Sequence, residues 1–216
     1  MQYPTSNIRF FWYLIYMYIV GLTGPIAAGK TTVAERLKEK GAIVISADRI
    51  GHDLFHKKEI KEKIKKEFGE EVFEDDHVDR KKLAKRAFES RESLDELNKI
   101  MWPPITKVID EELKLYSQKL PSNELIILDA ALLLDAGLDK STNMLVAVTS
   151  EREKQLERLM AKNYSKEQAG TRMKMQTPKN ELLEQSDYTI ENNSSLNSLN
   201  NEIEKLWHFI KKHGTS

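Results

Sequence analysis

The sequence contains no cysteine. This absence excludes disulfide bonds and thiolate metal sites, and it fits a reducing compartment, so we expect a cytoplasmic protein. Charge of one sign is not in excess either, because 34 Lys and Arg residues balance 34 Asp and Glu residues. A balanced chain has no overall basic field that would attract nucleic acid or an anionic membrane, so we expect no nucleic-acid partner.

Long hydrophobic runs are also missing. The apolar and aromatic stretch from Phe10 to Val20 is shorter than the roughly 20 residues that a membrane-spanning helix needs. It lacks the small-residue cleavage site of a signal peptide. We therefore expect residues 1–16 to be an N-terminal extension, with Met17 as the true start and no membrane partner. A short anchor on the membrane surface is the alternative.

Two further patterns are absent. The five histidines show no metal-ligand spacing, since His52 and His56 lie four residues apart without a third ligand nearby, and no zinc site is expected. The guanine-reading motif N-K-x-D is missing as well, because Asn98-Lys99 is followed by Ile100 and Met101 inside a helical pattern. This argues against a GTPase switch.

What the sequence does contain is a glycine-bounded loop between a strand and a helix. Residues 18–22 are apolar strand formers, Gly24 to Thr31 reads G-x-x-x-x-G-K-T, and a helical pattern follows over 32–40. Glycines let several N–H groups point at one anion, and the start of the helix adds its positive dipole end. This order predicts a phosphate-binding P-loop. The nucleotide-binding residues that we predict in it are Gly24, Pro25, Ile26, Ala27, Ala28, Gly29, Lys30, Thr31 and Thr32.

Within this loop, two side chains have predicted roles. Lys30 would reach the β- and γ-phosphates of a nucleotide, and the Thr31 hydroxyl would bind Mg²⁺. The expected ligands are therefore a nucleotide and Mg²⁺; the family resemblance described below implies that the nucleotide is ATP.

Strands and helices alternate along the rest of the chain. Apolar runs at 42–45, 124–128, 144–148 and 187–190 predict four more strands, and the alternation predicts a parallel sheet flanked by helices, an α/β fold. Ligands of such sheets bind at the carboxyl ends of the strands. Asp48 follows the second strand, where it could accept a proton from an attacking hydroxyl or simply cap the helix expected over 49–55.

Two other positions are candidates for the site. Asp129 follows the third strand, where a P-loop protein places a second Mg²⁺ contact. Arg158 and Arg172 lie on cation-rich helices after the fourth strand, and an arginine there could stabilise charge on a transferred phosphoryl group. Ordinary surface charge is the alternative for each arginine.

Residues 57–120 read as almost all helix. Gly69 is expected to end the first helix, Asp79 to cap the second, and Pro103 and Pro104 to break the third. The block could be a substrate-side insertion or scaffold.

Taken together, these segments resemble the dephospho-coenzyme A kinase family over nearly all of residues 17–210. The resemblance lies in the order and spacing of its motifs, which are GLTGPIAAGKTTVA, GAIVISADRI, IILDAALLLDAGLD, QLERLMAKN, RMKMQTP and DYTIENNSSL. It implies a P-loop kinase fold with a five-stranded parallel sheet. It further implies one domain over 17–216, with a helical coenzyme A-side insertion at about 57–119 and a helical lid at about 150–178.

The resemblance also implies a reaction, in which ATP phosphorylates the ribose 3′-hydroxyl of dephospho-coenzyme A to give coenzyme A and ADP. If the roles of the matching family residues apply here, Asp48 would be the general base, Arg158 the lid arginine, and Asn192 part of the loop near adenine. Lys30, Thr31 and Asp129 keep the roles given above. Oligomeric state is left open.

The chain departs from the family pattern at several positions. Ser46 replaces one of two aspartates, Lys162 replaces a second lid arginine, and a histidine is missing before Pro103. In the P-loop, Pro25, Ala27 and Ala28 replace less restrictive residues. Two alternative functions remain, a kinase of nucleoside monophosphates or similar acceptors, and a nucleotide-binding protein that has lost catalysis.

Overall fold

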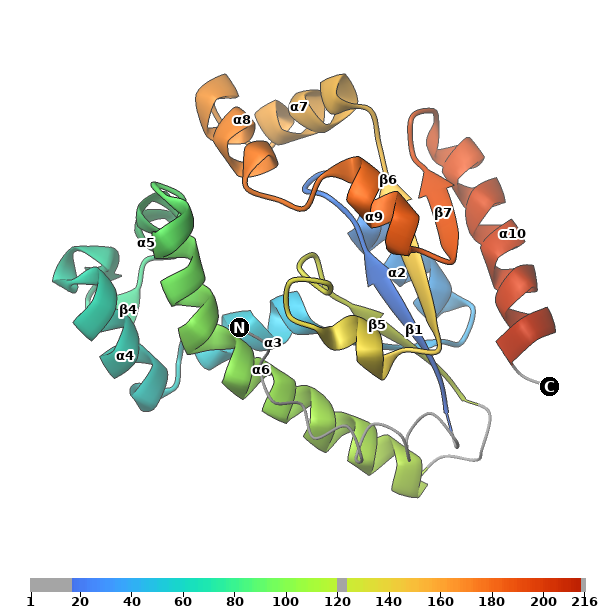
Figure 1. Cartoon of the computed structure of the whole chain (residues 1–216), viewed down its shortest axis with the longest axis horizontal. Coiled ribbons are helices and arrows are strands. Elements are labelled where there is room, and N and C mark those ends of the chain that lie inside the picture. The colour runs from blue at the N-terminus through green and yellow to red at the C-terminus, as the bar shows by residue number, and fades with distance from the viewer. Residues whose placement is uncertain (1–16, 120–123, 215–216) are drawn as a thin grey trace. The chain divides into compact units, whose positions relative to one another are not determined.

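The computed structural model describes residues 17–119 and 124–214, so the expected N-terminal extension at 1–16 lies outside the described residues. The described residues divide into two compact units, one made of residues 17–46, 112–119 and 124–214 and the other of residues 47–111. Figure 1 shows the elements of both units, which we describe separately.

The first unit is built on a five-stranded parallel sheet of the order β2-β5-β1-β6-β7. Its strands are β1 (Tyr18–Thr23), β2 (Ile43–Ser46), β5 (Leu125–Asp129), β6 (Met144–Thr149) and β7 (Tyr188–Glu191). These are the five strands predicted from the apolar runs, and the parallel α/β architecture is confirmed. β1 lies in the centre, between β5 and β6, so the loop that follows it opens at the middle of the carboxyl edge.

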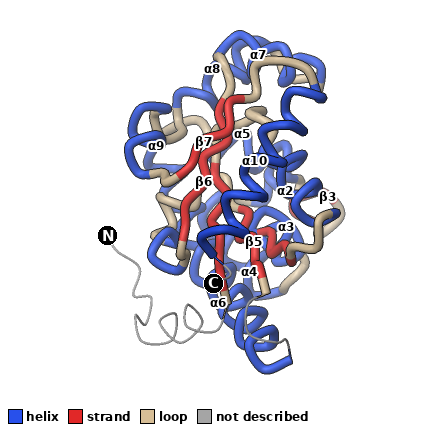
Figure 2. Tube along the Cα trace, turned by 90° about the vertical axis from the view of Figure 1, so that its right-hand side faces the viewer, coloured by secondary structure: helices blue, strands red, loops and turns tan. Residues whose placement is uncertain are grey.

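The helices of this unit are α2 (Lys30–Glu39), α7 (Arg152–Ala161), α8 (Lys166–Lys174), α9 (Lys179–Gln185) and α10 (Leu196–Gly214), with a short 3₁₀ helix η2 (Leu138–Ser141). Alternate strand residues such as Val20, Leu22 and Val146 pack in one buried cluster with Leu37 of α2 and Leu206 of α10. Figure 2 shows α10 alongside the strands. α7 and α8 lie beyond the carboxyl ends of the strands (Figure 1).

The second unit is mainly helical. It contains α3 (Ala47–Leu54), α4 (Lys58–Phe68), η1 (Glu70–Val72), β3 (Phe73–Glu74), β4 (His77–Val78), α5 (Arg80–Ala87) and most of α6 (Arg91–Lys119). Gly69 ends α4 with a φ of 81°, and the Asp79 carboxylate caps α5 by accepting from the N–H groups of Lys81 and Lys82. Both predictions are confirmed.

The region is almost all helix, as expected, and it also contains a short hairpin that the sequence analysis did not predict. In it β3 and β4 pair antiparallel, and the two turn residues, Asp75 and Asp76, both have positive φ. One expectation for this region was wrong. The prolines do not break the third helix, since α6 runs through Pro103 and Pro104. Burial of neighbouring side chains on α6, such as Trp102, offsets the loss of backbone hydrogen bonds.

Candidate active site

The predicted P-loop connects β1 to α2, and its two glycines are required by close packing. A Cβ on Gly24 would lie 2.2 Å from the carbonyl oxygen of Val148. A Cβ on Gly29, whose φ is 107°, would lie 2.2 Å from Nδ2 of Asn192. Any larger residue at either position would therefore push the loop away from its supports.

Ala27 holds an unusual backbone conformation in this loop. Its φ is 60°, in the left-handed region. That conformation costs a residue with a Cβ about 1–2 kcal/mol relative to the right-handed one. Such strain persists only where the surrounding contacts hold the backbone in place.

The inner side of the site contains a buried ion pair. Lys30, the first residue of α2, donates from Nζ to Oδ1 of Asp129 at the end of β5, and both residues are less than 10% exposed. The Ser46 hydroxyl at the end of β2 lies 3.4 Å from Asp129 Oδ2. The sheet register pairs Asp129 with Leu22 and Ser46, so three strand ends bring these groups together.

The outer side of the loop is held by Arg158 and Asn192. Arg158 of α7 donates to the carbonyl oxygens of Ala27 (3.0 Å), Ala28 (3.3 Å) and Asn192 (2.8 Å) and to the hydroxyl of Ser150 (3.2 Å). The buried Asn192 amide also donates to the Ala28 carbonyl, at 2.8 Å. Because a trans peptide points its C=O and N–H in opposite directions, a carbonyl of Ala28 held outward turns the N–H of Gly29 inward.

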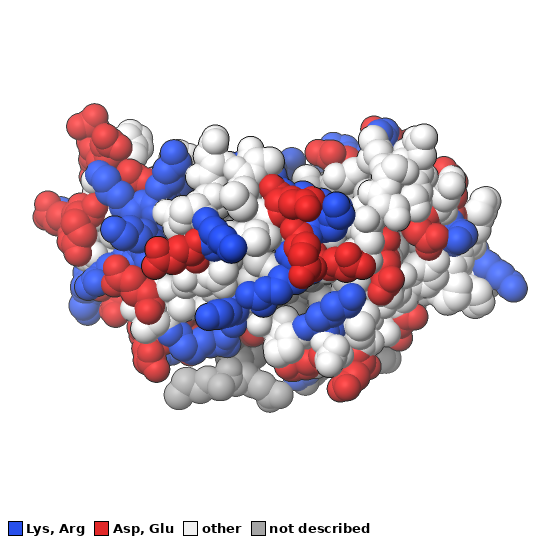
Figure 3. Space-filling view, turned by 90° about the horizontal axis from the view of Figure 1, so that it is seen from above, with Lys and Arg blue, Asp and Glu red and all other residues white. Residues whose placement is uncertain are grey.

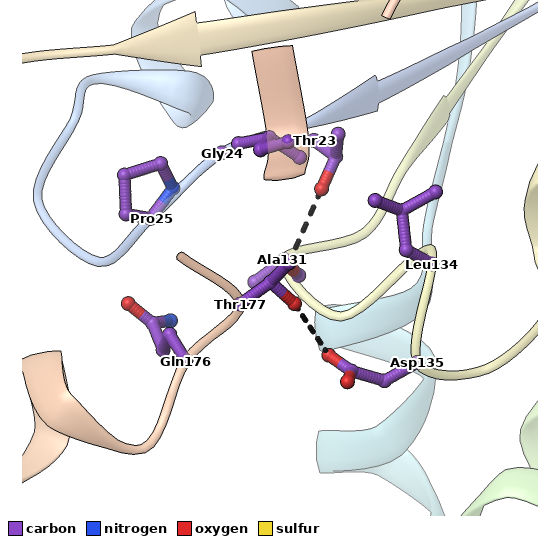
Figure 4. Close-up of a pocket in the computed structure, with 9 residues that line it drawn as sticks. Thr23, Gly24, Pro25, Ala131, Leu134, Asp135, Gln176 and Thr177 are labelled. Atoms are coloured by element: carbon purple, nitrogen blue, oxygen red, sulfur yellow. Dashed lines mark hydrogen bonds between the residues drawn. The ribbon is translucent and has the colours of Figure 1, made fainter. Parts of the chain in front are cut away.

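A third set of contacts comes from the segment after α8. The Ile26 N–H donates to Oε1 of Gln176 at 2.7 Å, and the Thr177 hydroxyl donates to Asp135 at 3.3 Å. Figure 4 shows Gln176, Thr177 and Asp135 around a small pocket that Thr23 and Gly24 also line. The P-loop, the loop after β5 and the end of the predicted lid therefore meet within the first unit.

The other predicted residues are placed as follows. Thr31 is exposed on the first turn of α2. Asp48 is exposed on the first turn of α3, which begins at Ala47, so the alternative in which it caps a helix starting at residue 49 is wrong. Arg172 lies over the Tyr164 ring, 4.8 Å from its centre, in a cation–π contact.

The oxygen atoms at this site suit a hard cation. Thr31 offers a hydroxyl and Asp129 a carboxylate, which match the all-oxygen preference of Mg²⁺. Among the residues that the structure describes, no three His, Cys, Asp or Glu side chains gather into a metal site. A metal here would depend on phosphate oxygens and water for most of its ligands, as Mg²⁺ commonly does.

Sequence reasoning missed three supporting side chains. Ser150 links Arg158 to Asn192, Gln155 donates to the Ser150 carbonyl at 2.8 Å, and Gln176 binds the P-loop. Gln155 and Gln176 belong to the motifs QLERLMAKN and RMKMQTP quoted above, and their membership of these motifs was the sequence signal that could have identified them.

The face of the molecule in Figure 3 shows no large field of one sign. Lys and Arg side chains are interspersed with Asp and Glu side chains over the face seen in Figure 3. Within residues 17–119 and 124–214, no helix combines the length and the apolar character that a membrane crossing requires.

Comparisons with known proteins agree with this geometry. A family model described as dephospho-CoA kinase matches residues 18–198. The dephospho-CoA kinase of Fusobacterium nucleatum subsp. nucleatum is 38% identical over 190 residues, which cover 87% of this chain and 96% of the relative. That of Saccharomyces cerevisiae is 35% identical over 198 residues, covering 88% and 81%.

Solved structures show the same fold. TT1252 from Thermus thermophilus is 28% identical, with a TM-score of 0.74 over 90% of this chain and 98% of the other. A dephospho-CoA kinase from Campylobacter jejuni (23% identical, TM-score 0.57) covers the same shares, 90% and 98%. A shikimate kinase from Acinetobacter baumannii (17%, 0.51) shares the fold over 93% of this chain and 96% of that one. The match over residues 18–198 and the identity to curated relatives together place this chain in the dephospho-CoA kinase family.

Proposed function

We propose that this protein transfers the γ-phosphoryl group of ATP to the ribose 3′-hydroxyl of dephospho-CoA, which yields CoA and ADP. The observation that carries the proposal is the family match over residues 18–198, which includes the P-loop and Arg158. An alcohol acceptor and ATP as the donor follow from the reaction that the family resemblance implies.

The nucleotide side is assigned to the first unit. The P-loop residues from Gly24 to Thr32 surround the phosphates, with the N–H of Gly29 turned inward by the contacts on the Ala28 carbonyl. Lys30 exchanges its partner Asp129 for the phosphates when ATP enters, because one ammonium group is attracted to the larger negative charge. Asn192 supports the loop from its outer side, next to the proposed adenine region.

Thr31 and Asp129 would hold Mg²⁺. When bound, the ion would neutralise charge on the β- and γ-phosphates. Release of Asp129 from Lys30 makes its carboxylate available as a ligand, directly or through water.

Asp48 is assigned to the acceptor. It would orient the ribose 3′-hydroxyl and accept its proton as the oxygen forms a bond to the γ-phosphorus. The bond between that phosphorus and the β–γ bridging oxygen breaks in the same step, and the electron pair leaves with ADP. Asp48 follows β2 by two residues and lies exposed, which keeps its carboxylate accessible to a substrate.

Arg158 is assigned two tasks in this proposal. Its fork already holds two carbonyl groups of the P-loop, and a shift of one N–H toward the transferred group would stabilise charge on it.

The test is an assay of the purified full chain with ATP, Mg²⁺ and dephospho-CoA, in which CoA and ADP are measured together. We expect one CoA for each ADP, and little ADP when AMP or another nucleoside monophosphate replaces dephospho-CoA. Preference for a monophosphate would indicate a different small-molecule kinase. ATP binding without turnover on any acceptor would indicate lost catalysis.

A further inference from the structure

Ala27 is fixed from both sides by side chains that are remote in the sequence. On its N-terminal side, the N–H of Ile26 is bound by Gln176, 150 residues further along the chain. On its C-terminal side, its own carbonyl is bound by Arg158, 131 residues further along. The predicted lid therefore holds the peptide unit directly after the strained residue, through Arg158, and the Pro25–Ile26 peptide unit, which lies one unit further before it, through Gln176.

The conformation held in this way is the one that an anion site needs. A residue in the left-handed region next to right-handed ones turns successive N–H groups toward one concavity, which binds phosphate. Glycine adopts this conformation without cost, whereas alanine does not. At position 27 this chain has alanine. The Ala28 N–H donates to the Pro25 carbonyl at 3.1 Å and closes the turn from within, and the contacts of Gln176 and Arg158 add to that restraint from outside the loop.

We propose that Gln176 is a positioning residue for nucleotide binding. Together with Arg158 it holds Ala27 in the left-handed conformation and so keeps the P-loop ready for phosphate. Pro25 adds to the need for Gln176, because it has no N–H of its own and leaves Ile26 as the donor through which this half of the loop can be held. The inference rests on the proposed nucleotide site but not on the identity of the acceptor.

The expected consequence concerns affinity for ATP. If Gln176 is lost, the loop relaxes to conformations that cannot bind phosphate, and the apparent Kd rises in inverse proportion to the competent fraction. With Ala27 in place, we expect Gln176→Met to raise the Kd for ATP about 5-fold, the effect of one lost hydrogen bond. In the Ala27→Gly background, the relaxed conformations gain little, and the same change should raise the Kd by less than about 2-fold.

The experiment is a double-mutant cycle of Gln176→Met and Ala27→Gly in the full chain. The Kd for ATP is measured by calorimetry without acceptor, and turnover is measured at saturating ATP. The matched control is Gln185→Met, because Gln185 is an exposed glutamine whose amide donates to Glu181 on its own helix, α9. The control should leave both the Kd for ATP and the turnover at saturating ATP unchanged.

Two results would overturn the inference. One is an unchanged Kd in folded Gln176→Met, and the other is an equal rise with and without the Ala27→Gly change, which would mean that Gln176 acts as general structure. If Gln176→Met does not fold, Gln176→Asn removes the same hydrogen bond with a shorter amide and is read in the same way. A wild-type chain that binds ATP but does not phosphorylate dephospho-CoA would contradict the proposed function, while the cycle would still test Gln176.

Discussion

The nucleotide side and the acceptor side of this protein differ in how their polar residues are held. In the first unit, Lys30, Asp129, Arg158 and Asn192 are tied to one another or to the P-loop backbone by hydrogen bonds. In the second unit, Asp48 lies exposed on the first turn of a helix. The proposed nucleotide side is thus held by hydrogen bonds before ATP arrives, whereas the carboxylate proposed for the acceptor side lies exposed to water until substrate covers it.

This difference implies that the two sides can be damaged separately. Changes in the first unit should alter both ATP affinity and rate, because binding and charge stabilisation use the same groups there. Changes at Asp48 should alter rate alone. The predictions below try to break that division, beginning with the largest effect.

Replacement of Lys30 should have the largest effect. Lys30→Ala removes the ammonium group that we propose contacts the transferred phosphate, so we expect kcat/KM for ATP to fall by about 10³-fold or more, through a lower kcat and a higher KM. The measurement is steady-state kinetics with dephospho-CoA. The matched control is Lys38→Ala, an exposed lysine on the same helix, which should behave as wild type.

This variant also leaves Asp129 buried without its cationic partner, which destabilises a fold. Lys30→Ala/Asp129→Asn removes that charge and should recover stability in a thermal melt without recovering rate. Full activity in folded Lys30→Ala would contradict the assignment of the whole P-loop.

Arg158 should show an intermediate effect. Arg158→Lys keeps the positive charge but loses the planar fork that reaches carbonyl groups on the P-loop and on Asn192. We expect the KM for ATP to rise about 10-fold, since two or more hydrogen bonds are lost. Arg152→Lys, an exposed arginine on the same helix, is the control, and equal kinetics in both variants would mean that the fork is not needed.

The smallest effect is expected at Asp79, which lies outside all the proposed site motifs in the sequence. Hydrogen bonds from the backbone N–H of Lys82 and, to a smaller extent, of Lys81 hold the pKa of Asp79 below its usual range. A carboxyl group with a lowered folded pKa stabilises the fold above its unfolded pKa, and this contribution is lost as pH falls through the folded pKa. Asp79→Ala should therefore lower the thermal midpoint by roughly a few degrees at neutral pH.

The difference in thermal midpoint between wild type and Asp79→Ala should become smaller at acidic pH. Asp79→Asn keeps an acceptor for the cap without the charge, so its midpoint should differ from wild type by less and with weaker pH dependence. A pH-independent deficit in Asp79→Ala would mean that the charge of the cap does not matter.

Local patterns in the sequence predicted most of the fold. All five strands of the sheet follow from short apolar runs, and the caps at Asp79 and Ser165 follow from hydrogen-bonding side chains at helix starts. The hairpin at 73–78 was missed because its strands are two residues each, although the Asp75-Asp76 pair tolerates positive φ and was a usable signal. Pro103 and Pro104 led to the wrong prediction of a helix break, because tertiary packing overrides the low helix propensity of proline here.

The candidate site was predictable only in part. The P-loop motif and the parallel topology are enough to predict that Lys30 lies near Asp129, because the P-loop and the end of β5 share one edge of the sheet. The contacts of Arg158 and Gln176 with the loop join segments more than 100 residues apart, and no local pattern encodes such contacts. The strain at Ala27 is likewise a property of the folded loop, not of its composition.

The division between the two sides is tested most directly by Asp48→Asn, with Asp53→Asn on the same helix as its control. The measurement is the Kd for ATP without acceptor beside kcat with saturating dephospho-CoA. The account predicts an unchanged Kd and a kcat lower by about 10³-fold, the scale of a lost general base. A kcat near that of wild type, or a Kd for ATP that rises along with the loss of rate, would contradict it.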